Sequence, residues 1–419
     1  MIHYPQEKVM SSRTYDVVIW GATGFTGRLV MDYMFRTYGV DGDVKWAVAA
    51  RNPVKLDEVK QLVLGDQAHA VPSVIADSED EVSLRELVAN ATAVCTTVGP
   101  YALYGTKLVA LCAELGTHYC DLTGEVQWMA RTIEQYDSAA SASGARIVHT
   151  CGFDSIPSDL GAYFVQKKMF ETHGVYASRV KYRVVNSNGG VSGGTVASLM
   201  NMMEESKRDP EVLDVIADPY ALNPLNMPRG EDGADQTSAV YDQDFKQWTG
   251  PFVMAGINTR VVRRSHALLG YPWGDHFRYD EAILTGNGPA GLAKASLIAG
   301  GTSLMNAVAA FTPTRNMLAR VAPAPGEGPS EETIKNGFFT IELFAAHPDD
   351  PALNMTAVVT GDRDPGYGAT SKMIAESAVC LAVDTLDSKP GITTPAAAMG
   401  DHLIARLQEK AGMTFSIKA

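Results

Sequence analysis

The segment Asp16-Val-Val-Ile-Trp20 runs directly into Gly21-Ala-Thr-Gly24-Phe-Thr-Gly27, and residues 28–38 then have the composition of a helix. An apolar strand, a glycine-rich turn and a helix in this order typically bind the pyrophosphate of a dinucleotide. Gly21 lets the chain leave the strand sharply, Gly24 lets the backbone approach the phosphates, and Gly27 lets the helix pack near the strand. An ordinary glycine-rich turn without a ligand is the alternative. We expect the cofactor to contact Gly21, Thr23, Gly24, Phe25, Thr26 and Gly27.

The second predicted strand, residues 45–50, indicates which dinucleotide is bound. It ends at Arg51, and Lys55 follows one helical turn later. Proteins that bind NAD usually carry Asp or Glu at this strand end to hold the ribose 2′-hydroxyl, whereas an arginine suits the 2′-phosphate of NADP. We therefore predict NADP as the cofactor and Arg51 as a cofactor ligand. The alternative is a solvated arginine without influence on cofactor choice.

Strands and helices continue to alternate as far as residue 150. The pattern predicts further strands at 73–76, 93–98 and 145–150, separated by helices at 54–64, 83–89, 103–115 and 127–143. Such alternation is typical of an α/β fold with a doubly wound parallel sheet of the Rossmann type. Ligands bind beyond the carboxyl ends of its strands. This rule places Asp77 near the adenine and Val98, Gly99 and Pro100 near the nicotinamide.

The pattern changes after about residue 163. Apolar and polar residues alternate in five segments, which are typical of strands in a mixed or antiparallel sheet with one solvated face: 179–185, 257–262, 277–284, 337–345 and 354–360. The tail contains two predicted helices, at 370–386 and 395–410. We therefore divide the chain into a Rossmann domain at 12–165, a second α+β domain at 166–365, and a C-terminal region at 366–419.

Composition excludes several classes of function. The formal charge of −13 argues against nucleic acid as a partner, because binding to phosphates needs a basic surface. Five cysteines lie in apolar surroundings without Cys-x-x-Cys spacing, so we expect reduced core thiols in a cytoplasmic protein, and neither disulfides nor a metal site. The leader 1–13 lacks the apolar region of a signal peptide.

The segment from Pro289 to Phe311 is rich in Ala, Gly, Leu and Val, but polar residues interrupt it. A membrane-spanning helix needs about 20 predominantly apolar residues, and this segment is less hydrophobic than that. We predict a buried or interfacial helix, and peripheral attachment to a lipid surface stays open.

Several blocks resemble the saccharopine dehydrogenase-like oxidoreductases, and more closely their trans-acting enoyl reductase branch. The blocks are 21–27, 98–101, Asp121-Leu-Thr-Gly-Glu125, Cys151-Gly-Phe-Asp-Ser-Ile-Pro-Ser-Asp159, 190–195, 258–264, 364–367 and 394–400. The resemblance covers nearly the whole chain from Tyr15. It implies a Rossmann domain, a second mixed sheet that carries substrate and often a dimer contact, and a C-terminal segment that returns to the first domain. It also implies NADPH-dependent reduction of carbon–carbon double bonds in polyketide-derived lipids, with an acyl substrate that a carrier could hold.

Enoyl reduction needs hydride from the cofactor and a proton donor from the protein. Tyr101 follows a glycine at the end of a predicted strand and is the first candidate for the donor. A tyrosine at this place could equally stack on the nicotinamide or fill the space between the domains. Asp154 is the second candidate, since the segment 151–159 belongs to the same rim.

A rival site has the residues of a short-chain carbonyl reductase. Tyr163 and Lys167 have a spacing that places both on one helix face, and Thr150 lies at a strand end before them. In such enzymes the lysine lowers the pKa of the tyrosine. Pro157 and Gly161, which lie close to these residues in the sequence, argue against this site, and the family that the chain resembles does not use it.

Two further functions stay open. One is an NADP-binding scaffold on a lipid surface without turnover, because no catalytic group is unmistakable. The other is a saccharopine-type imine reductase, which needs clustered basic groups. Arg260, Arg263 and Arg264 are candidates, but on the strand predicted at 257–262 and its continuation they would alternate faces and could not all converge.

Overall fold

A computed structural model describes residues 13–418 except 190–192, 226 and 311–327. Its first sheet, sheet A, has seven parallel strands in the order β13-β6-β5-β4-β1-β2-β3. The doubly wound parallel sheet predicted from the sequence is therefore confirmed. The strands are β1 (Tyr15–Trp20), β2 (Trp46–Ala50), β3 (Ser73–Ile75), β4 (Ala91–Thr96), β5 (His118–Cys120), β6 (Arg146–Val148) and β13 (Gly391–Thr393).

Helices cover both faces of sheet A, which explains why its central strands are continuous apolar runs. Val17 and Ile19 pack toward α1 (Phe25–Tyr38) and α14 (Thr370–Val383). Val18 and Trp20 pack toward the opposite helices. These are α3 (Glu81–Asn90), α5 (Thr106–Leu115) and α6 (Val126–Ser143), while α2 (Pro53–Leu64) and the short α4 (Tyr101–Tyr104) join the strands nearby.

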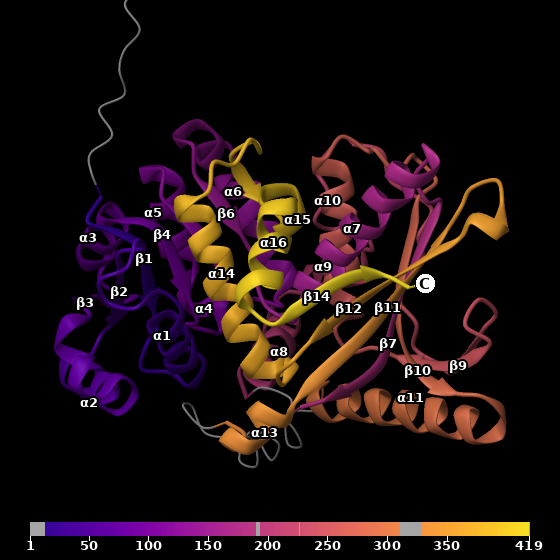
Figure 1. The fold of residues 1–419 in the computed structure, drawn as a ribbon, viewed down its shortest axis with the longest axis horizontal. Coiled ribbons are helices and arrows are strands. Elements are labelled where there is room, and N and C mark those ends of the chain that lie inside the picture. Colours follow the sequence, from indigo (N-terminus) through magenta and orange to yellow (C-terminus); the bar gives the residue numbers. More distant parts are fainter. Residues whose placement is uncertain (1–12, 190–192, 226, 311–327, 419) are drawn as a thin grey trace, which may run out of the picture.

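The second sheet, sheet B, has the order β14-β12-β11-β7-β10-β9-β8. Only the pair β7–β10 of these described strands is parallel, so the sheet is mixed, as predicted. Figure 1 shows it beside sheet A, with α7 (Ile156–His173) and α10 (Ala255–Leu268) between them. The strands are β7 (Arg179–Asn188), β8 (Val240–Asp242), β9 (Gln247–Pro251), β10 (Arg278–Gly286), β11 (Phe338–Ala346), β12 (Met355–Gly361) and β14 (Met413–Ile417).

The strand predicted at 257–262 is wrong, because these residues belong to helix α10. The helix is buried on nearly every side, and its polar residues are buried together with its apolar ones. Its arginines, the candidates for a basic cluster, are buried and hydrogen-bonded within the chain. Asp235 binds Arg260, Asp232 binds Arg263, and the carbonyls of Leu222 and Ile392 bind Arg264.

The C-terminal region joins both sheets. The two predicted helices are present as α14 and as the pair α15 (Pro395–Ala398) and α16 (Gly400–Lys410). Strand β13 extends sheet A beside β6, and β14 extends sheet B beside β12. In Figure 1, α14 and α16 (yellow) lie in front of the region between the sheets. Helix α7 runs across the boundary expected at residue 165, and the domain limits stay a prediction.

Helix α11 (Gly288–Ala310) lies along β9 and β10. A helix is therefore present in the segment where we expected one; the last residue of that segment, Phe311, lies outside the described residues. Leu297 and Leu304 are exposed on it. No helix in the described ranges is long and apolar enough to cross a membrane. Contact with a lipid surface and a homodimer stay predictions. The remaining helices are α8 (Gly193–Arg208), α9 (Glu211–Ala217) and α13 (Glu331–Asn336).

All five cysteines are buried free thiols, in agreement with the sequence prediction. Among the described residues, no group of His, Cys, Asp and Glu side chains could hold a metal ion.

Candidate functional site

The glycine-rich turn between β1 and α1 has the close packing that its sequence predicts. Gly21 has φ +92°, and a Cβ there would lie 2.6 Å from Cγ2 of Val98. A Cβ on Gly27 would lie 2.2 Å from the carbonyl oxygen of Gly21, so only glycine allows this approach of α1 to β1. A Cβ on Gly24 would lie 3.3 Å from the same oxygen.

The N-terminus of α1 fits an anion. Gly24 is its cap residue, no side chain of the described residues accepts a hydrogen bond from its first N–H groups, and its first turn carries no acidic residue. Thr23, Phe25 and Thr26 are partly exposed around it. An open helix N-terminus favours a phosphate through its free N–H groups and its dipole. The residues present therefore fit the pyrophosphate of a dinucleotide.

The other predicted cofactor residues lie at the carboxyl ends of neighbouring strands. Arg51 follows β2, is exposed, and forms no hydrogen bond or ion pair with another described residue. The next residue, Asn52, caps α2 by accepting from the Lys55 N–H (3.0 Å). Asp77 follows β3 and accepts from the Glu79 N–H (3.0 Å). Val98, Gly99 and Pro100 follow β4 and are at least partly exposed, and Val98 touches the glycine turn.

Tyr101 points into the protein. Its side chain is 5 % exposed, and its hydroxyl donates to the Thr96 carbonyl (3.3 Å) and accepts from the Leu122 N–H (3.1 Å). Its ring stacks on Trp128. Burial, followed by the charge of Asp121, raises the pKa of Tyr101 well above its ordinary value. In this arrangement the hydroxyl is bonded to the backbone on both sides, so the tyrosine contributes rigidity to the rim.

Asp154 lies in the loop after β6 and is partly exposed. A Cβ on Gly152 would lie 3.0 Å from its Oδ2 and 2.7 Å from the Leu122 side chain, so the carboxyl lies near the loop after β5. Burial of the carboxyl, and then the charge of Asp121, raises the pKa of Asp154 to about 7. A carboxylic acid with this pKa carries a proton in a large fraction of molecules at neutral pH, which suits a general acid.

Sequence reasoning did not assign two acidic residues that are central to this rim. Asp121 follows β5 and is fully buried, and Glu125 follows four residues later. Glu125 accepts from the N–H groups of Tyr101 (2.8 Å) and Ala102 (2.9 Å) and from the Ser198 hydroxyl (2.8 Å). The available signal was the run Asp121-Leu-Thr-Gly-Glu125 directly after an apolar strand, the position where parallel sheets place their site residues.

The segment that follows β12 lies against the same rim. The rings of Phe25 and Tyr367 meet edge to face, with centroids 4.8 Å apart. Thr370 accepts from the Phe153 N–H (3.0 Å) at Oγ1. The glycine turn and the Asp154 loop therefore both contact residues that connect sheet B to α14.

The rival groups do not assemble into sites. Tyr163 and Lys167 both bind Asp401 of α16, at 3.3 and 2.6 Å. Thr150 is buried, and its hydroxyl donates to the carbonyl of its neighbour His149. The three arginines of α10 hold carboxylates and carbonyls of this chain, as described above. The argument that these arginines alternate faces on a strand is wrong, because they lie on helix α10, where residues of this chain occupy their guanidinium groups.

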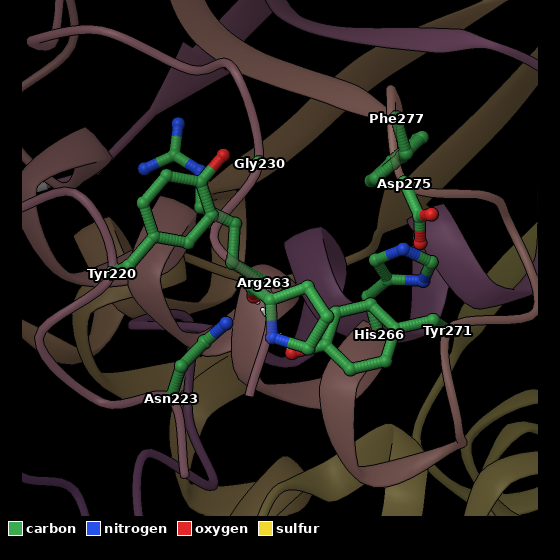
Figure 2. A pocket seen from close by; sticks show the side chains of 9 residues that line it. Tyr220, Asn223, Gly230, Arg263, His266, Tyr271, Asp275 and Phe277 are labelled. Atoms are coloured by element: carbon green, nitrogen blue, oxygen red, sulfur yellow. Dashed lines mark hydrogen bonds between the residues drawn. The ribbon is translucent and has the colours of Figure 1, made fainter. Parts of the chain in front are cut away.

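A small cavity beside α10 lacks the room for a substrate (Figure 2). Its volume is about 10 Å³, enough for about one water molecule. Its lining includes Asn223 and His266. Oδ1 of Asn223 and Nδ1 of His266 have no hydrogen-bond partner among the described residues.

Comparison with known proteins agrees with this geometry. Residues 17–148 match the family described as the saccharopine dehydrogenase NADP binding domain. A trans-acting enoyl reductase of Mycobacterium ulcerans is 36 % identical, with 95 % of this chain and 97 % of that protein covered. One of Mycobacterium tuberculosis is also 36 % identical, with 95 % and 96 % covered. Apo saccharopine dehydrogenase (L-Glu forming) of Saccharomyces cerevisiae has the same fold, with a TM-score of 0.50, 13 % identity, and coverage of 96 % and 99 %.

Proposed function

The chain belongs to the trans-acting enoyl reductases of the saccharopine dehydrogenase-like NADP-dependent oxidoreductases, and from this membership we propose that it reduces a carbon–carbon double bond of an acyl substrate. Lipid or polyketide intermediates, free or held by a carrier, are the proposed substrate class. Bound NADPH supplies the hydride.

The place and the raised pKa of Asp154 are the observation that supports this proposal. The reduction adds hydride to the β-carbon and a proton to the α-carbon, and an acidic side chain at the rim supplies that proton faster than water does. Asp154 combines partial exposure, a place beyond the end of β6 and a pKa raised by burial to about 7. Its carboxyl donates the proton and recovers one from water after each turnover.

The other residues of the rim bind and orient. Gly21, Gly24 and Gly27 with the N-terminus of α1 hold the pyrophosphate, and Arg51 binds the 2′-phosphate. Tyr101, the sequence candidate for the acid, is the alternative donor, but its hydroxyl is bonded to Thr96 and Leu122. We assign it a role in shaping the nicotinamide side of the rim, together with Val98, Gly99 and Pro100.

The test uses the purified protein, NADPH and a panel of enoyl thioesters, with loss of absorbance at the reduced-nicotinamide band as the signal. Asp154→Asn should lower kcat roughly 10²–10⁴-fold, which is the usual effect of a positioned acid, with unchanged affinity for NADPH. In the unaltered protein, kcat should fall as the pH rises above about 7, because the carboxyl loses its proton.

Tyr101→Phe is the matched control and should change kcat less than about tenfold, since it removes only bonds to backbone groups. If Tyr101→Phe abolishes turnover and Asp154→Asn does not, the tyrosine is the donor. If no enoyl thioester consumes NADPH although NADPH binds, the proposed reaction is wrong, and a non-catalytic NADP-binding scaffold becomes the better description.

A further inference from the structure

Asp121 is fully buried at the end of β5 and is surrounded by donors. Oδ2 accepts from the Tyr119 hydroxyl (2.9 Å) and lies 2.7 Å from Nδ1 of His149. Oδ1 accepts from the N–H groups of Thr123 (3.0 Å) and Thr150 (3.1 Å). Each oxygen of the carboxyl therefore has two polar partners, of which the Tyr119 hydroxyl and the two N–H groups donate, while the role of the His149 nitrogen depends on the tautomer of the ring.

The same residue joins the loop after β5 to the loop after β6. The Cys151 N–H donates to the Asp121 carbonyl (2.7 Å), and the Asp121 N–H donates to the Val148 carbonyl (3.4 Å). Between these bonds lies Thr150, which has φ +62°, a strained conformation for a β-branched residue. Because its N–H binds the carboxylate, the strained turn that leads to Asp154 depends on Asp121.

The loop after β5 is ordered by the same carboxylate. Thr123 binds Oδ1 through its N–H and accepts from the Glu125 N–H (3.1 Å) at its hydroxyl. Glu125 in turn holds the N–H groups of Tyr101 and Ala102. One buried carboxylate therefore organises the three loops that follow β4, β5 and β6.

The charge of Asp121 also reaches the neighbouring ionisable groups. It raises the pKa of Asp154 to about 7 together with burial, which is the larger cause. The other titratable groups around this position are Tyr101 on α4, Tyr119 on β5, His149 after β6 and Glu125 before α6. Burial, and after it the charge of Asp121, raises the pKa of Tyr101, of Tyr119 and of Glu125, and Asp154 also raises that of Tyr101.

We propose that Asp121 is a positioning residue of the reduction: its hydrogen bonds fix the loops after β5 and β6, and its charge acts on Asp154. The inference rests on the proposed function for the role of Asp154. A purely structural Asp121 would affect stability alone, whereas a positioning Asp121 also sets the pH range in which Asp154 carries its proton.

The test removes the charge of Asp121 and keeps the shape of its side chain. In Asp121→Asn, the amide oxygen can still accept from Thr123 and Thr150, and the amide N–H groups can donate to Nδ1 of His149 once the ring changes its tautomer. The basic limb of the kcat–pH profile should move down by roughly one pH unit, because the repelling charge is gone. Asp121→Glu keeps the charge, so it should lower kcat while the basic limb stays in place.

A second readout does not require turnover. Carbon-13 NMR of aspartate carboxyls, with the Asp154 signal assigned by its loss in Asp154→Asn, should show titration near pH 7 in the unaltered protein and at lower pH in Asp121→Asn. Asp159→Asn is the matched control, because Asp159 is equally buried but binds Ser265 and the Ala396 N–H instead. It should leave the Asp154 titration unchanged.

The outcomes separate the two proposals. If Asp154 titrates near the ordinary aspartate value of about 3.9 in the unaltered protein, the inference is overturned, and this result does not depend on the folding of any Asp121 variant. An unmoved titration in a folded Asp121→Asn overturns it as well. If the titration moves but no enoyl substrate is reduced, the electrostatic link between Asp121 and Asp154 stands and the proposed reaction fails.

Discussion

Two neighbouring residues at the end of β2 have different roles. Arg51 is exposed and available for a ligand, while Asn52 beside it is used to cap α2. The sequence alone could assign these positions, because the glycine turn fixes which strand is second and which residue ends it. The orientation of Tyr101 could not be foreseen in the same way, since its partner Leu122 comes from a loop about twenty residues further along the chain.

Arg51→Asp should shift the preference of the protein from NADP toward NAD. A carboxylate repels the 2′-phosphate and accepts from the ribose 2′-hydroxyl of NAD. A hydrogen bond to a charged group contributes about 1.5–3 kcal/mol, so the Kd for NADPH should rise roughly 10–100-fold. Calorimetric titration with both reduced cofactors measures this change, and Lys168→Asp, on the exposed side of α7, serves as the control. Equal affinity of the unaltered protein for NADPH and NADH would contradict the role of Arg51.

Among the elements, α10 shows where pattern reasoning fails. Six residues of alternating polarity suit a strand, but the same residues suit a helix that is buried all around, and a short window cannot separate the two. The partners that neutralise its arginines come from the loop at 218–235 and from β13, which a local pattern does not contain. Strands β5 and β13 were missed for a related reason, because three residues carry almost no periodicity.

Arg264→Met should destabilise the protein strongly. The guanidinium of Arg264 is buried and donates to the carbonyls of Leu222 and Ile392, so its loss leaves two buried acceptors unpaired. Each costs about 1–3 kcal/mol, and the free energy of unfolding should fall by roughly 2–5 kcal/mol in urea titrations. Arg36→Met, which removes an exposed pair with Asp32, should change it by less than about 1 kcal/mol. A variant at Arg264 as stable as the unaltered protein would show that these bonds contribute little.

At the scale of the whole molecule, two sheets share one interior. A continuous apolar cluster extends from Ile19 of sheet A through Leu160 of α7 to Leu343 of sheet B. The alternation of strands and helices was enough to predict sheet A, and the period-2 segments were enough to predict that sheet B exists. The order of strands in sheet B depends on pairings across the whole chain, so it could not be derived from local sequence.

The burial of all five cysteines gives a test of this interior. Burial raises the pKa of Cys120 well above its ordinary value and raises those of Cys112 and Cys380, so these thiols stay protonated and unreactive. A thiol-specific chromogenic disulfide should find almost no reactive thiol in the native protein, and five per chain in denaturant. Rapid reaction of any thiol under native conditions would contradict this packing.

The position of β13 and α14 in the chain, after every strand of sheet B except β14, has a consequence for synthesis on the ribosome. The strands β1 to β6 emerge first, but the edge of their sheet beside β6 and one of its faces are completed only by residues 370–393. The nucleotide-binding half therefore cannot reach its final form when strands β1 to β6 have emerged, in contrast to a domain built from one continuous segment. Until residues 370–393 have left the ribosome, a nascent chain of this protein exposes the unpaired edge of β6 and the apolar face under α14.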